Sequence, residues 1–304
     1  MTDSTPAIQP RFSIVIASRN AEATIGRTLQ SLVDQAYPNL QVVCIDGAST
    51  DGTLAVIRRY EDLVSVLVSE PDHNVADALN KGFKRSDGVL LGYVNADDAL
   101  ALGTLGQVAQ LFQDNPDVDV ITGGCHRVYA DGSDCNTQVR PDFLEVLALM
   151  NPLEQPSTFW RRSAWERAGP FDVAYFLAFD WEYWNRLRRS GARFLTTDMV
   201  LAHYYFSDTN LTSTGGLEVV REMFRITRTY GPYRGLVAYL YLALYNTFDL
   251  RGYYDKPFSE LPRRRQLIFG LTIKLLYGIL GRRIVNSYNW NFASKQQRGL
   301  VWYK

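Results

Sequence analysis

Two adjacent carboxylates stand directly after an apolar stretch of the sequence. Asp97 and Asp98 follow residues 89–94, which are typical of a buried strand, and Asn95 lies two positions before Asp97. Neighbouring carboxylates repel, and each raises the pKa of the other. A turn followed by a helix N-cap would explain both acids, because Asp is favoured at both positions. A hard divalent cation would also explain them, so this stretch alone leaves both interpretations open.

The elements around these acids alternate between strand and helix. The predicted strands are residues 12–17, 41–46, 64–69, 88–94 and 118–122, and the predicted helices include 25–33 (with Thr24 as cap and Ile25, Leu29, Leu32 and Val33 on one face), 54–60 and 75–86. Strands separated by helices at this spacing indicate βαβ units and a parallel sheet.

Polar side chains follow three of these strands. Asn20 lies just past the first strand, Asp46 ends the second, and Asp97 and Asp98 follow the fourth. Ligands of open parallel sheets bind outside the carboxyl ends of the strands. The convergence of these side chains therefore favours a ligand site over four unrelated turn residues.

The middle of the chain predicts a hairpin and a helix rich in aromatic residues. A two-residue turn at Asp131-Gly132 would place Cys135 opposite Val128, so a disulfide with Cys125 is not expected and a reducing cytoplasm fits. Residues 178–191 predict a helix with Trp181, Trp184 and Leu187 on one face. The first twelve residues contain no apolar signal core.

Charge is distributed unevenly along the 304 residues, although the formal net charge is zero. Residues 251–304 hold 11 Lys+Arg and 2 Asp+Glu, a net charge of +9, which leaves −9 on residues 1–250. A basic segment of this kind indicates an anionic partner: a membrane, a phosphate-bearing substrate or nucleic acid. Nucleic acid is not expected, because the segment contains no known recognition module.

Six segments, in this order, resemble the family 2 inverting glycosyltransferases of GT-A fold. They are "SIVIASRNAEATIGRTLQSL", "VVCIDGASTDGT", "SEPDHNVADALNKGF", "GVLLGYVNADD", "QPSTFWRRSAWERAGPFD" and "FDWEYWNRLRRSG". The resemblance covers residues 12 to about 212. It implies an α/β fold with a Rossmann-like, mostly parallel sheet flanked by helices.

The resemblance also implies a domain organisation. A GT-A domain is expected over residues 1–215, with a nucleotide-sugar half over about 12–122 and an acceptor half over about 123–215. Residues 216–304 are expected to form a helical, basic C-terminal extension.

Residues that match the family's nucleotide-sugar positions lie in the first half. They are Ala17, Asn20, Asp46, Asp77, Lys81, Asn95 and Asp97. Structural alternatives stay open for two of them, since Asp77 could be a first-turn helix acid and Lys81 a solvated helix residue.

The family's Asp-x-Asp motif falls on Asn95, Ala96 and Asp97, with Asn in place of the first Asp. The resemblance implies Mn²⁺ or Mg²⁺ bound mainly by Asp97, with His203 as a further candidate ligand. A cation there would offset the carboxylate repulsion and neutralise charge on a departing diphosphate. His203 could equally be an interior histidine with its hydrogen bonds satisfied.

The expected catalytic base is an acid at the start of the late helix, which is Asp180 here, with Glu182 as the second candidate. A helix N-cap is the structural alternative for Asp180. The expected acceptor side comprises Asp98, Gln155, Trp160 and Trp181. The two tryptophans could stack on a sugar or belong to the core.

The C-terminal segment predicts a helix over residues 263–283 whose apolar stretch, flanked by arginines, is too short to span a membrane. It could lie on an anionic bilayer. It could instead pack against the catalytic domain or against a second copy of the chain.

Together these features predict a metal-dependent, inverting glycosyltransferase of the hexosyltransferase type. The expected donor is a nucleotide sugar, UDP-linked by preference, and the expected acceptor is a saccharide or a lipid-linked hydroxyl in polysaccharide or glycolipid synthesis. Two alternatives remain: a nucleotide-sugar-binding protein with impaired catalysis, and a sugar-phosphate nucleotidyltransferase, although the Gly-rich loop of that class is missing after the first strand. The expected location is cytoplasmic, peripheral to the inner face of a membrane.

Overall fold

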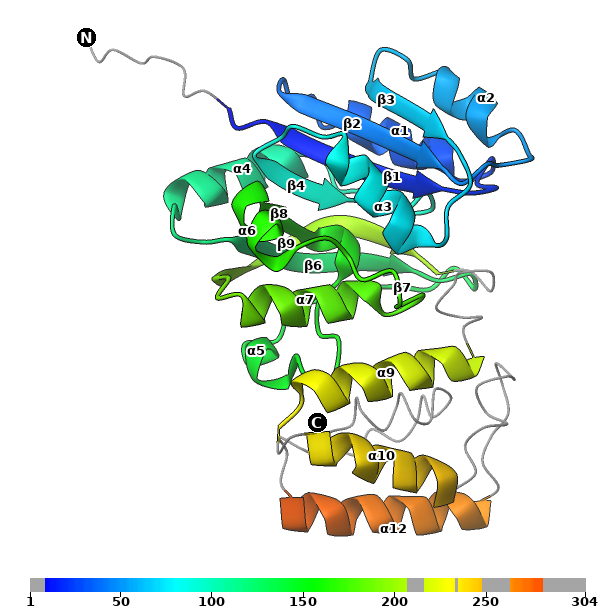
Figure 1. Cartoon of the computed structure of the whole chain (residues 1–304), viewed down its shortest axis with the longest axis vertical. Coiled ribbons are helices and arrows are strands. Elements are labelled where there is room, and N and C mark those ends of the chain that lie inside the picture. Colours follow the sequence, from blue (N-terminus) through cyan, green and yellow to red (C-terminus); the bar gives the residue numbers. More distant parts are fainter. Residues whose placement is uncertain (1–8, 207–215, 233–234, 248–262, 281–304) are drawn as a thin grey trace. The chain divides into compact units, whose positions relative to one another are not determined.

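The structure is a computed structural model of the chain and describes residues 9–206, 216–232, 235–247 and 263–280 (Figure 1). The chain divides into two compact units. The first comprises residues 1–139 and 153–206, and the second comprises 140–152 and 207–304. The domain boundary expected at residue 215 stays a prediction.

The first unit is built on a nine-stranded sheet with the order β3-β2-β1-β4-β8-β6-β9-β5, and β7 pairs with β6. Its strands are β1 (Phe12–Ser18), β2 (Leu40–Asp46), β3 (Val64–Ser69), β4 (Leu90–Tyr93), β5 (Ala99–Leu100), β6 (Val120–Val128), β7 (Asp134–Asn136), β8 (Thr158–Arg161) and β9 (Phe194–Tyr205).

The sheet is mixed, and its longest pairings, β1 with β2 and β6 with β9, are parallel, as predicted. Strands β1 to β4 are parallel to one another. Strand β8 then pairs antiparallel with both β4 and β6, and β5 pairs antiparallel with β9. Because β1 to β4 run in the same direction, their carboxyl ends share one edge, which is where the candidate side chains lie.

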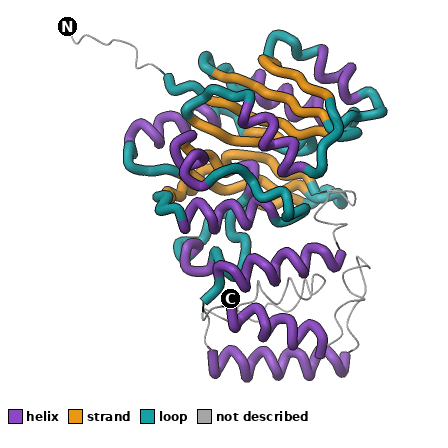
Figure 2. Tube along the Cα trace, viewed as in Figure 1, coloured by secondary structure: helices purple, strands orange, loops and turns teal. Residues whose placement is uncertain are grey.

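Helices cover both faces of this sheet (Figure 2). They are α1 (Ile25–Val33), α2 (Thr53–Arg58), α3 (Val75–Lys84), α4 (Thr104–Asp114), α6 (Arg162–Ala168) and α7 (Phe179–Arg189), with a 3-10 helix η1 (Gln155–Ser157). Helices α3, α6 and α7 lie in front of the sheet in Figure 1, and α1 and α4 lie behind it.

The two faces have cores of different composition. The α1 and α4 face is mainly aliphatic, with Ile14, Leu29 and Val108 among its buried residues. The opposite face is aromatic, and its ring-to-ring contacts join Phe83, Tyr93, Trp160, Trp165, Phe171, Phe179, Tyr183 and Trp184. Burial of large aromatic side chains contributes strongly to stability, so this cluster anchors the loops at the front of the sheet.

Two expectations about local geometry are wrong. Val33 is 43% exposed because it lies off the buried face of α1. Cys135 pairs with Arg127 and not with Val128. The turn contains three residues, since the Tyr129 N–H donates to the Ser133 carbonyl and Gly132 has a φ of 82°. A third residue shifts the register by one. All three cysteines are free thiols.

The second unit is helical where it is described. It contains α5 (Phe143–Val146), α9 (Gly216–Tyr230), α10 (Leu236–Thr247) and α12 (Arg263–Leu280). Helices α9 and α10 pack together, with the Phe224 and Tyr239 ring centroids 5.5 Å apart. Within the described residues, no helix combines the length and the hydropathy needed to cross a membrane. The predicted helix is present as far as Leu280, and its last residues, 281–283, lie outside the described part of the chain.

Candidate active site

The loop after β4 is held by a buried hydrogen-bond network centred on Asp98. This carboxylate is 1% exposed and accepts from the Tyr205 N–H at 3.2 Å and from Asn95 Nδ2 at 3.2 Å. Asn95 Nδ2 also donates to Gln155 Oε1 at 3.0 Å, and Gln155 Nε2 donates to the Tyr93 carbonyl at 2.8 Å. Asp98 and Gln155 therefore fix the loop, and neither presents a face to an acceptor.

Asp97 is the acid of this loop that solvent reaches, because it is only partly buried. Its backbone carbonyl accepts a hydrogen bond of 2.6 Å from Arg27 Nη2. The Arg27 guanidinium also lies 3.5 Å from the centroid of the Tyr205 ring. Arg27 thus fixes the backbone at Asp97, whose side chain remains partly exposed.

The two carboxyl groups raise each other's energy when both are charged. Burial, and then the charge of Asp97, raises the pKa of Asp98 well above its usual value. Burial also raises the pKa of Asp97, which its own N–H and Arg27 partly counteract. An additional positive charge would favour the ionised form of both groups.

The side chains at this loop supply only part of the ligands that a hard divalent cation needs. Asp97 supplies a carboxylate oxygen of the kind that Mn²⁺ and Mg²⁺ bind, but the described residues contain no group of three His, Cys, Asp or Glu side chains that could enclose a metal. Such a site would need phosphate oxygens or water to complete the coordination. His203 pairs with Ala99 of β5, and its ring centroid is 5.4 Å from that of His126.

The environment keeps His203 neutral near pH 7. Burial, and then the neighbouring His126, lowers the pKa of His203. A neutral imidazole can bind a metal, but among the described residues His203 belongs to no group of three His, Cys, Asp or Glu side chains that could hold one.

The loops after β1 and β2 are tied to each other. The Asn20 N–H donates to Ser49 Oγ at 2.8 Å, and Asn20 Oδ1 accepts from the Thr50 N–H at 2.9 Å. Asn20 has a φ of 49°, which Asn tolerates better than most residues. Ala17 is partly buried in β1, one position before its last residue.

Asp46 is fully buried and holds the loop that follows it. Its carboxylate accepts from the Ser49 N–H at 2.9 Å, from Ser69 Oγ at 2.7 Å and from the Ser49 hydroxyl. With 0% exposure it offers no surface to a base in this conformation. In this conformation Asp46 shapes the loop, and its contact with a nucleotide stays a prediction.

In the last turn of α3, Lys81 is held between two acids. Its Nζ lies 3.2 Å from Asp77 Oδ2 and 3.3 Å from Glu70 Oε1, and it donates to the Pro71 carbonyl at 2.9 Å. Against the effect of burial, the His73 N–H and Lys81 hold the pKa of Asp77 below its usual value. Lys81 is thus no freely solvated helix residue, and the pair fixes the loop at residues 70–73.

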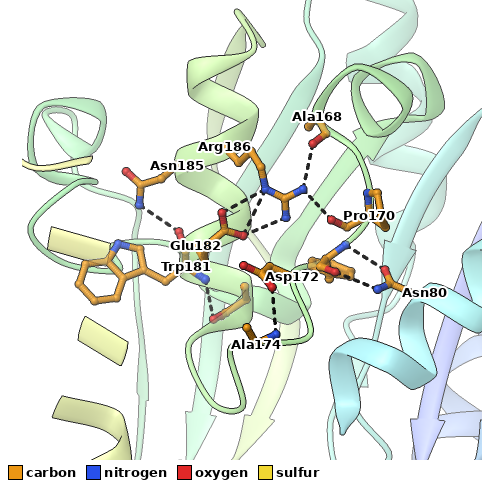
Figure 3. Close-up of polar contacts among 11 residues, drawn as sticks. Asn80, Ala168, Pro170, Asp172, Ala174, Trp181, Glu182, Asn185 and Arg186 are labelled. Carbon is orange, nitrogen blue, oxygen red and sulfur yellow. Dashed lines mark hydrogen bonds and ion pairs between the residues drawn. The ribbon is translucent and has the colours of Figure 1, made fainter. Parts of the chain in front are cut away.

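The two acids of α7 differ in their surroundings, and Figure 3 shows those of Glu182. Glu182 is 4% exposed, and its carboxylate receives Arg186 Nη2 at 2.9 Å and Nε at 3.1 Å. Arg186 Nη1 donates to the carbonyls of Ala168 and Pro170, at 2.9 and 2.6 Å. Asp180 is only partly buried, in the first turn of the helix. Asp180 is therefore the acid that a substrate can reach.

The loop leading to Asp180 is held from both sides. Asn80 of α3 donates to the Phe171 carbonyl and accepts from the Phe171 N–H, both at 2.9 Å. Asn74 donates to the Val173 carbonyl at 2.9 Å. Together with Arg186, these contacts fix residues 168–173 and hence the start of α7.

Tyr93, the last residue of β4, packs against Phe179 at the start of α7. Its side chain is 2% exposed, and its ring centroid is 6.1 Å from that of Phe179, the residue before Asp180. Burial, and then the charges of Asp180 and Asp98, raise the pKa of Tyr93 well above its usual value. The Tyr93 hydroxyl has no hydrogen-bond partner among the described residues.

The tryptophans expected on the acceptor side belong to the core. Trp160 is 0% and Trp181 1% exposed, and the Trp160 ring packs edge-on against Trp184 at 5.5 Å. Neither ring has a free face for a sugar, which favours the core alternative for both.

Sequence reasoning missed three residues that organise the site: Arg27, Tyr93 and Arg186. Arg186 lies four residues after Glu182, a spacing that predicts an ion pair on one helix face. Arg27 and Tyr93 gave no such signal, because their partners lie far away in the sequence.

A mixed α/β sheet whose parallel strands end in these acids, with helices on both faces, is the GT-A class of glycosyltransferase fold. Residues 13–169 match the profile described as Glycosyl transferase family 2. The chain belongs to this family, as the resemblance predicted, and is a glycosyltransferase.

Curated relatives are described as glycosyltransferases. A Mycobacterium tuberculosis H37Rv protein, PGL/p-HBAD biosynthesis glycosyltransferase Rv2957, is 28% identical over 178 residues, which cover 57% of this chain and 68% of the relative. The putative teichuronic acid biosynthesis glycosyltransferase TuaG of Bacillus subtilis is 31% identical over 93 residues, 30% of this chain and 37% of TuaG.

Solved structures share the fold at lower identity. The mannosyltransferase PcManGT of Pyrobaculum calidifontis, in complex with GDP-Man and Mn²⁺, has a TM-score of 0.62 at 21% identity over 95% of this chain and 87% of its own. S. aureus TarS 1–349 in complex with UDP-GlcNAc has a TM-score of 0.59 at 16% identity, over 90% and 81%.

Proposed function

We propose that this chain transfers a sugar from a nucleotide-sugar donor to an acceptor hydroxyl with inversion at the anomeric carbon. The observation that carries the proposal is the position of two accessible acids: Asp97 and Asp180 are both partly exposed, while their neighbours Asp98 and Glu182 are buried. Asp97 can bind a cation at the donor diphosphate, and Asp180 can take the proton from the acceptor hydroxyl.

The proposed donor is a nucleoside diphosphate sugar, with UDP as the preferred nucleotide. The similar structures that contain UDP-GlcNAc, UDP and GDP-Man support the donor class. In the proposed mode the linked loops at Asn20 and Ser49 accommodate the base and ribose. Lys81 and Asp77 fix the adjacent loop, and Asp46 acts by shaping it.

Asp97 is the residue that would hold Mn²⁺ or Mg²⁺, with the donor diphosphate supplying further oxygens. When bound, the cation supplies positive charge that stabilises the leaving diphosphate. Asn95 and Asp98 keep Asp97 in place through the network of the loop.

Asp180 is the proposed general base. It takes the proton from the acceptor hydroxyl as that oxygen bonds to the anomeric carbon, while the bond from this carbon to the diphosphate oxygen breaks. A single in-line displacement of this kind inverts the configuration. Arg186, by anchoring residues 168–170, keeps Asp180 at the rim.

The proposed acceptor is a saccharide or a lipid-linked saccharide in polysaccharide or glycolipid synthesis. The names of the mycobacterial and Bacillus relatives support this class. The proposed place of action is the cytoplasmic side of a membrane.

A donor panel tests the proposal. Thermal-shift measurements with UDP- and GDP-sugars should show stabilisation by the true donor, because ligand binding to the folded state raises its stability. Incubation with an acceptor panel should then release the nucleoside diphosphate and give a product of inverted configuration. Donor binding without turnover on any acceptor would favour an impaired binding protein. Formation of nucleotide sugar from nucleoside triphosphate and sugar phosphate would favour a nucleotidyltransferase.

Metal dependence is tested at Asp97. Asp97→Asn should lower transfer by about a hundredfold or more, because the variant loses the charge that holds the cation. It should also abolish the additional thermal shift that Mn²⁺ produces in the presence of UDP. Asp62→Asn, an exposed acid elsewhere in the unit, is the matched control. Full wild-type activity in EDTA would contradict the metal assignment.

A further inference from the structure

Helix α12 presents an apolar stripe to solvent. Ile268, Leu271, Leu275 and Ile279 are 48%, 67%, 65% and 68% exposed. Their spacing of three and four residues places them on one side of the helix. Exposed apolar patches on helices mark interaction surfaces, so this stripe requires a partner.

The same unit carries a second exposed apolar stripe on α10. Leu236, Tyr239 and Leu242 are 66%, 52% and 38% exposed at intervals of three residues. A tyrosine among aliphatic residues suits the boundary between apolar and aqueous phases, because its ring is apolar and its hydroxyl is polar.

The α12 stripe is accompanied by basic residues on the same helix. Arg264 and Lys274 are exposed, and the sequence of the helix, Arg263–Leu280, contains no acidic residue. Helix α9 adds the exposed residues Arg221, Arg225 and Arg228 to the same unit. A fitting partner is therefore apolar and anionic at once.

We infer that α12 docks lengthwise on the surface of an anionic lipid bilayer, with its apolar stripe at the level of the acyl boundary and its basic residues among the headgroups. A helix that combines exposed apolar residues with basic ones can bind in this way, through apolar contact and attraction to anionic lipid. Each basic residue near such a surface strengthens binding about fivefold. This inference goes beyond the proposed sugar transfer and does not depend on it.

A second copy of the chain fits the stripe less well. In a parallel pair of α12 helices the arginines at 263–265 would face the same residues of the other copy. An antiparallel pair gains no opposite charge, because the sequence of the helix, Arg263–Leu280, contains no acidic residue. Like charges in the parallel pair, and the lack of opposite charges in either pair, oppose association.

Vesicle co-sedimentation of the full chain tests the inference. Phosphatidylcholine vesicles containing phosphatidylglycerol should bind the protein at low salt, and binding should fall as salt rises, because exposed charges are screened. Vesicles of phosphatidylcholine alone should bind at least tenfold more weakly. Equal binding to both kinds of vesicle, or none to either, would overturn the inference.

Two matched pairs of variants locate the surface. Leu271→Glu should weaken vesicle binding at least tenfold, whereas Leu102→Glu, at a leucine of the first unit that is 77% exposed, should not. Lys274→Glu should weaken binding, whereas Arg58→Glu, an exposed basic residue on α2, should not. Equal effects within either pair would overturn the inference.

Sedimentation velocity without lipid tests whether the stripe instead binds a second copy of the chain, because it measures whether the protein is a monomer or a dimer. A monomeric wild-type chain that binds vesicles supports the bilayer. A dimer that Leu271→Glu converts to monomer, with no vesicle binding, would assign the stripe to a second copy. Thermal shift by the donor reports on the first unit independently in either case.

Discussion

Each pair of neighbouring acids in the site combines one buried carboxylate with one that solvent reaches. Asp98 is held by Asn95 and the Tyr205 N–H, and Glu182 is held by Arg186. Their partners in sequence, Asp97 and Asp180, remain partly exposed. A buried, fully hydrogen-bonded acid is held rigidly. We therefore expect the accessible acid of each pair, Asp97 or Asp180, to contact the substrates.

The α7 pair gives the first prediction at this scale. Asp180→Asn should lower kcat by about 10²–10⁴-fold with donor affinity nearly intact, because the amide keeps the shape but cannot take the proton. Glu182→Gln should instead lower the unfolding temperature, because it leaves the Arg186 charge half-buried and unpaired. Rate measurements and thermal unfolding of both variants separate the two roles. If Glu182→Gln is folded but inactive while Asp180→Asn stays within a few-fold of wild type, the base is Glu182.

Tyr93 gives the second prediction at the residue scale. Removal of a buried hydroxyl without a partner should raise the free energy of unfolding by about 1 kcal/mol. If that hydroxyl orients Asp180 during the reaction, Tyr93→Phe should nevertheless lower kcat about tenfold, the value of one hydrogen bond. The acidic limb of the pH profile should move to higher pH, because a lost hydrogen bond to a carboxylate raises its pKa.

Tyr183→Phe is the control for this experiment, because Tyr183 also has a buried hydroxyl without a partner in the described structure and packs in the same aromatic cluster. Tyr183→Phe should be as stable as Tyr93→Phe, and it should keep the activity of the wild type. A Tyr93→Phe variant with an unchanged rate and pH profile would assign Tyr93 to packing alone.

At the site, the sequence predicted which strand ends carry acids but not which acids are accessible. Asp97 and Asp46 were identified as candidates from their positions at strand ends and Asp180 from the family resemblance, yet Asp46 is 0% exposed. Its burial depends on Ser69, which lies on the next strand of the sheet and 23 residues further along the chain. Residue spacing contains no information about such a contact.

At the scale of the elements, the close approach of α3 to β1 depends on Gly82. A Cβ atom at this position would lie 2.3 Å from Val15 Cγ1, so any larger residue would displace the helix that carries Asp77, Asn80 and Lys81. Crowding of this kind costs about 1–3 kcal/mol. Because Gly82 has no side chain, α3 can lie close to β1. The position of α3 in turn fixes the loop before α7.

Gly82→Ala should therefore lower the free energy of unfolding, despite the better helix propensity of alanine. Gly106→Ala is the matched control: it also lies inside a helix, α4, but a Cβ atom there would have nothing within 4 Å. It should raise stability by about 0.5–1 kcal/mol, the propensity difference alone. Chemical denaturation of both variants measures the contrast, and equal stabilisation by both would show that α3 can move without cost.

The long apolar elements were predictable and the short ones were not. The predicted strands at 12–17 and 64–69 lie within β1 and β3 as observed. Strand β5, with two residues, is too short to show a period, and β8 lies in a segment whose aromatic residues suit either strand or core. The antiparallel direction of β8 follows from packing between β4 and β6, which no local pattern expresses.

At the scale of the whole molecule, the two units are not consecutive in sequence. Residues 140–152 leave the first unit and belong to the same compact unit as residues 207–304. This segment contains buried apolar side chains, among them Leu147 at 0%, Leu149 at 2% and Met150 at 1% exposure. A division into an N-terminal and a C-terminal part would therefore cut one compact unit in two.

Truncation tests this organisation. A chain that ends at Phe206 keeps residues 140–152 but loses the rest of their unit, so Leu147, Leu149 and Met150 should become accessible to water. Each newly exposed side chain of this size costs about 1.5–3 kcal/mol, and the truncated protein should aggregate and bind a hydrophobic dye. A chain that ends at Thr247 keeps α9 and α10 and should remain monodisperse, with the donor-induced thermal shift of the full chain. Equal solubility and donor binding by the two truncated chains would show that residues 140–152 need no partner from the C-terminal helices, and would restore a simple boundary near residue 215.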